Sequence, residues 1–220
     1  GNFPWMQTPN LDNLVNEGVH FKNAFVTTSL CGPSRASFLT GTYASRHGVI
    51  VNEHVDYDLE LPTFPLLLQE AGYHTGFIGK WHQAMHNRPR PGFDHWMCFW
   101  GQGKYFNDVF KMHNDQEYKM EAGKYLTDEL NDLAVSFINQ ERGDQPFMLY
   151  LSHKAPHQPF TPAPRHRQLY RDFKIPSQDN PKDDLASKPA YVRESAIKNR
   201  SNPTGLARLH PQIPNKMRTL

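Results

Sequence analysis

A lone cysteine lies where a helix is predicted to begin, in residues 31–41 (CGPSRASFLTG). Pro33 is typical of the first helical turn, so Cys31 would sit at a helix N-terminus, where backbone N–H groups favour an anion. Arg35 follows one turn later and could hold the same anion. An isolated cysteine is more often a small buried side chain, but these neighbours favour a nucleophile. A nucleophile of the tyrosine-phosphatase type is excluded, because its arginine lies further from the cysteine.

A second segment, residues 72–82 (GYHTGFIGKWH), ends a predicted strand with a lysine and a histidine. Side chains two residues apart on an extended chain point the same way, so Lys80 and His82 could face one tetrahedral anion. The alternative for His82 is a hydrogen-bonded histidine of the core. A zinc pair of His82 and His86 is disfavoured, because prolines follow closely and no third ligand is evident. We expect His86 in a loop.

A third segment, residues 154–160 (KAPHQPF), places His157 just after a predicted buried strand. Taken alone, this histidine fits a structural role as well as a chemical one. His153 precedes it by four residues, but the proline between them breaks the helical geometry that would pair the two rings. We therefore assign no role to His153.

Together the three segments resemble the signatures of the type I, formylglycine-dependent sulfatases of the alkaline-phosphatase-like superfamily. Residues 31–41 match Cys-x-Pro-Ser-Arg followed by Leu-Thr-Gly at every fixed position. Residues 72–82 are similar to the signature that ends in Gly-Lys-x-His, and residues 154–160 resemble an Ala-Pro-His-x-Pro segment. Agreement at so many positions is specific. The resemblance covers roughly residues 5–165 and implies a hydrolase of sulfuric esters.

The resemblance implies a role for each matched side chain. A maturation enzyme would oxidise Cys31 to formylglycine, whose hydrate is a geminal diol. One diol oxygen attacks sulfur, and the other later releases its proton to expel sulfate. Arg35 would hold the modified residue, and Lys80 would contact both the sulfate and the nucleophile. His82 would be the base that takes the diol proton, and His157 would contact the ester and help to protonate the leaving oxygen.

The resemblance also implies a calcium ion, or in some members magnesium, that the matched segments do not bind. The family holds it with an Asp-Asp pair on the first strand, an Asp-Asn pair on a later strand and the formylglycine, here Cys31. The first pair would precede Asn2. Asp179 and Asn180 match the residue types of the later Asp-Asn pair. Pro181 follows them and no predicted strand precedes them, so we interpret this match as a coincidence. We expect an interior part of a sulfatase roughly twice as long, which is catalytic as a whole and impaired or inactive as this piece alone.

Apolar periodicity and turn residues predict the elements that position these segments. The predicted helices are residues 8–18, the segment from residue 31, 63–71 and 123–140, and the predicted strands are 19–27, 74–78 and 147–151. Their alternation indicates an α/β fold, a three-layer α/β/α sandwich with a largely parallel sheet that is incomplete in this chain. Ligands would bind beyond the carboxyl ends of the strands.

Residues 83–118 are rich in aromatic residues, proline and glycine, and are predicted to be loops that carry specificity. They look like those of bacterial sulfatases that act on glycans. Four aromatic side chains could either stack on sugar rings or pack the loops on the sheet; they are Trp96, Trp100, Tyr105 and Phe106. Two other functions stay open. One is a phosphonate monoester or phosphodiester hydrolase of the same superfamily, and the other is a non-catalytic remnant that binds polyanions.

The charge is unevenly distributed along the 220 residues, although the net charge is only +2. Residues 1–160 contain 12 Lys and Arg against 17 Asp and Glu, whereas residues 161–220 contain 12 against 5. This basic end supports the polyanion alternative, but no nucleic-acid motif accompanies it. We predict a partial catalytic domain at residues 1–173 and a Pro-rich basic tail at 174–220, in loop or poorly ordered conformation.

The cysteine content and the distribution of apolar residues bear on disulfides, metal sites and membrane segments. Cys31 and Cys98 are the two cysteines and form no CxxC pair, so neither a disulfide framework nor a cysteine-based zinc site is indicated. No apolar run approaches the roughly 18–20 residues that span a bilayer, and residues 1–5 do not resemble a signal peptide. The resemblance implies a parent protein that is periplasmic or secreted, or lysosomal in a eukaryote.

Overall fold

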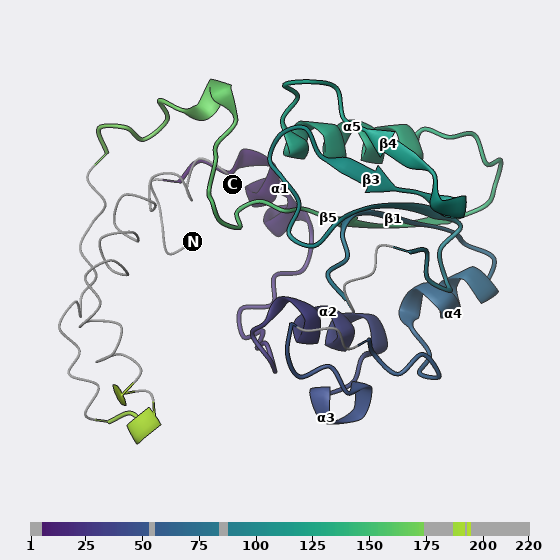
Figure 1. Cartoon of the computed structure of the whole chain (residues 1–220), viewed down its shortest axis with the longest axis horizontal. Coiled ribbons are helices and arrows are strands. Elements are labelled where there is room, and N and C mark those ends of the chain that lie inside the picture. Colours follow the sequence, from purple (N-terminus) through teal and green to yellow (C-terminus); the bar gives the residue numbers. More distant parts are fainter. Residues whose placement is uncertain (1–5, 53–55, 84–87, 174–186, 192, 195–220) are drawn as a thin grey trace.

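The computed structural model describes residues 6–52, 56–83, 88–173, 187–191 and 193–194, and Figure 1 shows a sheet between layers of helices. The strands are β1 (His74–Lys80), β2 (His95–Phe99), β3 (Val109–Lys111), β4 (Glu117–Lys119) and β5 (Phe147–Ser152). The helices are α1 (Pro9–Glu17), α2 (Cys31–Thr40), α3 (Ala44–His47), α4 (Phe64–Glu70) and α5 (Leu126–Ile138), with 3-10 turns η1 (His113–Asp115) and η2 (Pro164–His166). His86, the Asp179 and Asn180 pair, residues 1–5 and most of the predicted tail lie outside the described residues.

The sheet has the order β4-β3-β2-β1-β5, and β1 is parallel to both of its neighbours, β2 and β5. These parallel pairings confirm the expectation from the alternation of helices and strands. β3 and β4 add antiparallel pairings at one edge, so the sheet is mixed. The loop prediction for residues 83–118 was wrong where β2, β3 and β4 form. Strands of three to five residues carry too little alternation to stand out in an aromatic-rich sequence.

Helices cover both faces of the sheet, with α5 on one face and α2 and α4 on the other (Figure 1). Successive side chains of β1 alternate between the two faces. Phe77 packs with Trp96 and with Leu39 of α2, whereas Ile78 packs with Leu130 of α5. This arrangement confirms the three-layer α/β/α sandwich and the helices predicted from residue 31, at 63–71 and at 123–140.

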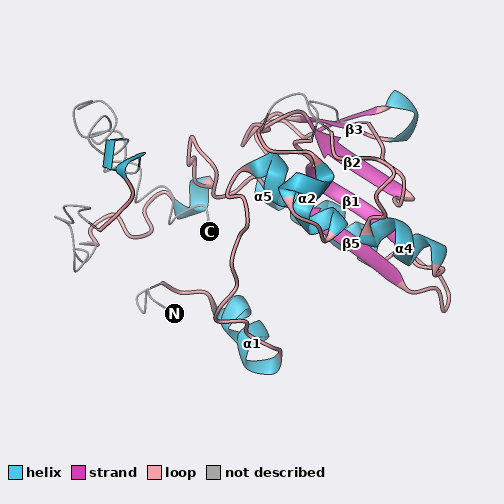
Figure 2. Cartoon of the chain, turned by 90° about the horizontal axis from the view of Figure 1, so that it is seen from below, coloured by secondary structure: helices cyan, strands magenta, loops and turns pink. Residues whose placement is uncertain are grey.

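The N-terminal segment is set apart from this sandwich, and Figure 2 shows α1 well away from the sheet. The helix predicted at residues 8–18 is present as α1, but none of its residues is buried. The strand predicted at residues 19–27 is absent from the structure, and Phe21 and Phe25 are 78% and 88% exposed. A strand is stable only when a neighbour completes its hydrogen bonds, and no described strand pairs with this segment.

Among the described residues, the structure contains no helix that combines the length and apolar character needed to span a membrane.

Candidate active site

The three predicted segments meet at one edge of the sheet, where parallel strands deliver their carboxyl ends. β1 ends at Lys80, its parallel partner β5 ends at Ser152, and α2 begins at Cys31 directly after an extended Leu30. Carboxyl ends of neighbouring parallel strands are the usual place for a ligand in an α/β sheet. The three segments therefore lie at the carboxyl ends of the parallel strands, where the sequence predicts that a ligand would bind.

Cys31 and Lys80 are in contact across the gap between α2 and β1. Lys80 Nζ lies 3.6 Å from Cys31 Sγ, and the lysine is 3% exposed. Burial lowers the pKa of Lys80, the interaction with Cys31 opposes this, and the charge of Arg35 lowers it further. Cys31 also lines a cavity of about 630 Å³ together with Arg35 and His153. An anion that enters this cavity meets the sulfur atom and the guanidinium side by side.

Arg35 connects the helix that carries Cys31 to two strands. Its Nη1 donates to the backbone oxygen of Lys80 and to Ser152 Oγ, each at 2.6 Å. Burial is the main cause that lowers the pKa of Arg35, although arginine stays protonated at any ordinary pH. These contacts connect α2 to β1 and β5. Arg35 therefore has a structural role in the site and is not part of a surface ion pair.

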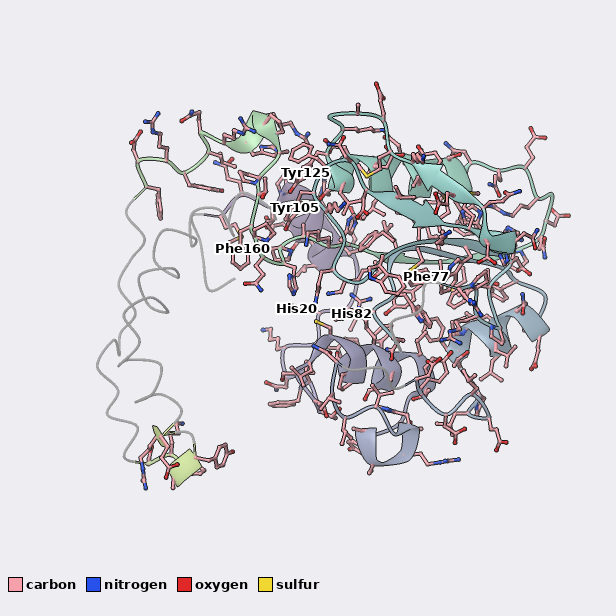
Figure 3. The ribbon with its side chains drawn as sticks, in the orientation of Figure 1. His20, Phe77, His82, Tyr105, Tyr125 and Phe160 are labelled. Atoms are coloured by element: carbon pink, nitrogen blue, oxygen red, sulfur yellow. The ribbon has the colours of Figure 1, made fainter. Side chains whose placement is uncertain are left out.

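His82 lies between the sheet and α2, two residues beyond β1 (Figure 3). Its backbone is left-handed, with φ of 53°, a conformation uncommon for residues other than glycine. Burial, followed by the charges of Lys80 and Arg35, lowers the pKa of His82 to about 4. The ring is therefore neutral at pH 7 and able to accept a proton, as a general base requires.

His157 lies beside this group rather than in the first cavity. Its Nδ1 is 3.0 Å from the backbone oxygen of Gln158, and its own backbone oxygen accepts a hydrogen bond from Tyr105 at 2.6 Å. Burial lowers its pKa, Gln158 opposes this, and the charge of Lys80 lowers it further. His157 lines a second cavity of about 420 Å³ with Gln102 and Gln158. The structure thus brings His157 within electrostatic reach of Lys80 and His82, whereas His153 lines the cavity around Cys31.

Several polar side chains that hold this site have no recognisable spacing in the sequence. Gln83 donates to the backbone oxygen of Gly32 at 2.8 Å, and Asn52 accepts from the backbone N–H of Gly32 at 2.7 Å. Lys154, 4% exposed, donates to the backbone oxygen of Gln102 at 3.0 Å. Ser152 could have been noticed as the residue that ends a predicted strand. The other contacts join loops distant in sequence, and only the fold reveals them.

The loop aromatics divide between packing and exposure. Trp96 is 1% exposed and stacks on Phe77, and Tyr105 is 4% exposed and stacks on Tyr125, the two rings lying together in Figure 3. Both belong to the packing of the loops on the sheet, so they are not free to stack on a sugar. Trp100 is 54% exposed and lines a cavity of about 430 Å³. Phe106 is half-buried and packs against Tyr125, so Trp100 is the most exposed of the four and the best placed for a ring contact.

The described residues do not form the calcium site that the resemblance implies. They contain no group of three or more His, Cys, Asp or Glu side chains placed to hold a metal ion. The described charged neighbours of Cys31 are Lys80 and Arg35, which are cationic and would repel a divalent cation. We derive no step through a metal ion from these residues.

The chain belongs to the sulfatase family, whose family model matches residues 2–215. An N-acetylglucosamine-6-O-sulfatase of Bacteroides thetaiotaomicron is 38% identical over 192 residues, which are 86% of this chain and 33% of that protein. An ulvan-active sulfatase of Formosa agariphila is 35% identical over 185 residues, 79% of this chain and 34% of that protein. The chain therefore spans about a third of the length of these curated relatives.

A solved structure confirms the fold over a larger share of both chains. A protein in complex with its substrate, D-glucosamine-2-N,6-O-disulfate, superposes with a TM-score of 0.76 at 26% identity. The match covers 98% of this chain and 54% of that chain. The α/β sandwich described above is thus the fold of the sulfatases and of the alkaline-phosphatase-like superfamily.

Proposed function

We propose that the protein of which this chain forms part hydrolyses sulfate esters of glycans with a formylglycine made from Cys31. The observation that carries this proposal is the contact of Cys31 Sγ with Lys80 Nζ at 3.6 Å, at the start of α2. The sulfatase relatives and their sulfated-sugar names support the same class of reaction and substrate.

The hydrated aldehyde would supply two hydroxyl groups on one carbon: one oxygen attacks sulfur as the alcohol leaves, and loss of the other hydroxyl proton re-forms the aldehyde and releases sulfate. Lys80 would donate to the sulfate and to the nucleophile, which occupies the position of Sγ. His82, neutral because its pKa is about 4, would take the hydroxyl proton. His157, whose pKa is lowered mainly by burial, would give a proton to the leaving alcohol.

Three further expectations belong to the complete protein. A calcium or magnesium ion would be held by the formylglycine at residue 31 and by further oxygen ligands from outside the described residues. A formylglycine-generating maturation enzyme would be a partner before activity begins. The protein would act in the periplasm or outside the cell, or in the lysosome of a eukaryote, as expected for enzymes that meet sulfated glycans there.

Mass spectrometry of the peptide that contains Cys31 tests the nucleophile. The full-length protein is produced with a formylglycine-generating enzyme. A loss of about 18 Da relative to the thiol is expected, because the side chain becomes an aldehyde, whereas the usual oxidised forms of a thiol gain oxygen. A thiol that stays unmodified under these conditions contradicts the proposal. Cys31→Ala is the control, since it leaves α2 intact and removes the only atom that can be matured.

Turnover by the matured protein separates the functions that remain open. A panel of sulfated sugars, aryl sulfate, aryl phosphonate and phosphodiester is assayed with Cys31→Ala as the blank. Faster release of sulfate than of the phosphorus leaving group supports the proposal, and the reverse order indicates the phosphonate or phosphodiester hydrolase. Salt-sensitive glycan binding without turnover, equal in the protein and in Cys31→Ala, indicates a polyanion-binding remnant.

A further inference from the structure

One side chain contacts both Lys80 and His82, and no motif of the sequence singles it out. Gln102 lies in the loop after β2. Its amide Oε1 is 2.5 Å from Lys80 Nζ, and its amide Nε2 is 3.4 Å from His82 Nε2. A single planar amide therefore lies between the group placed to contact sulfate and the group placed to accept a proton.

The chemistry of the three groups fixes the direction of each hydrogen bond. An ammonium group has donors and no acceptor, so the amide oxygen of Gln102 must face Lys80. The amide NH₂ then faces His82, and it can only donate. His82 Nε2 must be the acceptor and carry a lone pair, which places the ring proton on Nδ1. A reversed amide would set two donors against each other at the Lys80 contact.

The other ring nitrogen does not fix the tautomer. His82 Nδ1 is buried and has no hydrogen-bond partner among the described residues. Histidine tautomers are usually set by a partner on the nitrogen remote from the reaction. With that nitrogen unpartnered in the described part of the chain, the amide of Gln102 is the group that selects the tautomer.

The loop that carries Gln102 is itself held rigidly. The backbone oxygen of Gln102 accepts from Lys154 Nζ at 3.0 Å, and the same ammonium donates to Gln158 O at 3.1 Å. Gly103 has φ of +65°, and a Cβ there would lie 2.6 Å from the ring of Phe99. The loop therefore packs so closely on the sheet that the next residue must be glycine. This support gives the Gln102 amide a fixed position.

We infer that Gln102 is a positioning residue, whose amide holds the Lys80 ammonium beside Cys31 and keeps Nε2 of His82 unprotonated. The catalytic part of this inference rests on the proposed function. The tautomer of His82 does not, because it is a property of the folded protein whether or not it turns over.

The first test reads the tautomer directly. The full-length protein is labelled with ¹⁵N-histidine, and the ring signals of His82 are assigned by their loss in His82→Asn. At neutral pH we expect Nδ1 to carry the proton in the parent protein, and the Nε2-protonated form to appear in Gln102→Leu. The matched control is Gln145→Leu, which removes an exposed amide that donates to Gly72 O at 3.0 Å near the start of β5. An Nε2-protonated His82 in the parent, or a tautomer unchanged in Gln102→Leu, overturns the inference.

The second test measures turnover of the matured protein. In Gln102→Leu we expect kcat to fall by about tenfold to a hundredfold, as for other side chains that orient catalytic groups, with KM within about twofold. Gln102→Glu keeps an acceptor for Lys80 but offers His82 only an acceptor, so it should not restore kcat even though it is nearly isosteric. Unchanged kcat in Gln102→Leu, or full rescue by Gln102→Glu, contradicts the inference. If the parent has no activity at all, the proposed function fails, and the tautomer measurement alone decides the role of Gln102.

Discussion

Arg35 Nη1 lies 2.6 Å from the backbone oxygen of Lys80. The helix that begins at the candidate nucleophile is thereby connected to the strand that ends in the candidate sulfate-binding lysine. The same nitrogen also reaches Ser152 on the neighbouring strand. This guanidinium group is thus one of the contacts that set the distance between nucleophile and lysine, and changes to it should affect stability and chemistry together.

Replacing Arg35 tests this connection. Arg35→Met leaves the backbone oxygen of Lys80 and the Ser152 hydroxyl without their donor, and we expect a loss of about 2–4 kcal/mol in the free energy of unfolding, because hydrogen bonds from a charged group are the strong ones. Urea unfolding of the full-length protein measures it. Arg46→Met is the control: Arg46 pairs with Asp58 at a side-chain exposure of 63%, and we expect less than about 1 kcal/mol. Equal losses in the two variants would show that the Arg35 contacts contribute nothing special.

The pKa of His82 predicts how stability depends on pH. The folded-state pKa of about 4 lies below the ordinary value of 6.5, so the folded protein favours the neutral ring. As pH falls from about 6.5 to about 4, the unfolded chain binds a proton at this position before the folded chain does, and stability is lost over that interval. His82→Gln should have a smaller loss between these pH values, measured by urea unfolding. An identical pH dependence in both proteins would contradict the lowered pKa.

The same pKa predicts the activity profile. If His82 takes the hydroxyl proton, kcat/KM should hold its value down to a pH well below 6.5 and fall as the pH approaches about 4, where the ring becomes protonated. The matured full-length protein is assayed between pH 3.5 and pH 8 with a sulfated sugar. An acid limb centred near 6.5 would assign the base to a histidine of ordinary pKa instead.

The approach of β1 to β5 predicts a severe effect at one glycine. A Cβ on Gly79, at φ of +118°, would lie 2.0 Å from the backbone oxygen of Ser152. We expect Gly79→Ala to cost at least about 3 kcal/mol, because the clash is with backbone and no side chain can move aside. Gly143→Ala is the control: its φ is also positive, at +58°, but nothing lies within 4 Å, so it should cost only about 1–2 kcal/mol. Thermal or urea unfolding that gives equal losses would refute the close approach.

Trp100 predicts a difference between large and small substrates. As an exposed ring on a cavity, it can stack on a sugar outside the reacting centre, and such contacts contribute about 0.5–1.5 kcal/mol. Trp100→Ala should therefore raise KM for a sulfated oligosaccharide several-fold and leave KM for a small aryl sulfate unchanged. Tyr43→Ala removes another exposed aromatic, 69% exposed, and should change neither. A parallel rise for both substrates would remove Trp100 from glycan binding.

Much of the framework could be predicted from the sequence, because glycines, prolines and apolar spacing mark long elements clearly. α2, β1, β5 and α5 were predicted in this way, and their ends place Cys31 and Lys80 correctly. The same reasoning predicted a strand at residues 19–27, where alternation is present but a pairing partner is not. It missed β2 to β4, whose few residues pair through contacts distant in sequence.

The candidate site shows the same division. Residues within a signature were predicted, since their spacing is local. Ser152, Gln102 and Lys154 were not, because a hydroxyl, an amide or an ammonium group acts here through partners that the chain brings close only after the sheet forms. The register that pairs Gly79 with Ser152 illustrates this, because the need for a glycine at residue 79 becomes evident only when Ser152 lies beside it.

The outer edge of β5 determines how this protein should be handled in the laboratory. Among the described residues β5 pairs only with β1, and the apolar side chains at residues 19–27 are turned to solvent. An unpaired strand edge is a template for intermolecular β-pairing, and exposed phenylalanines elsewhere in the same chain add to the tendency to associate. Produced as these 220 residues alone, the chain should form soluble aggregates or inclusion bodies at high concentration, so recombinant work on the site should begin from the longer polypeptide.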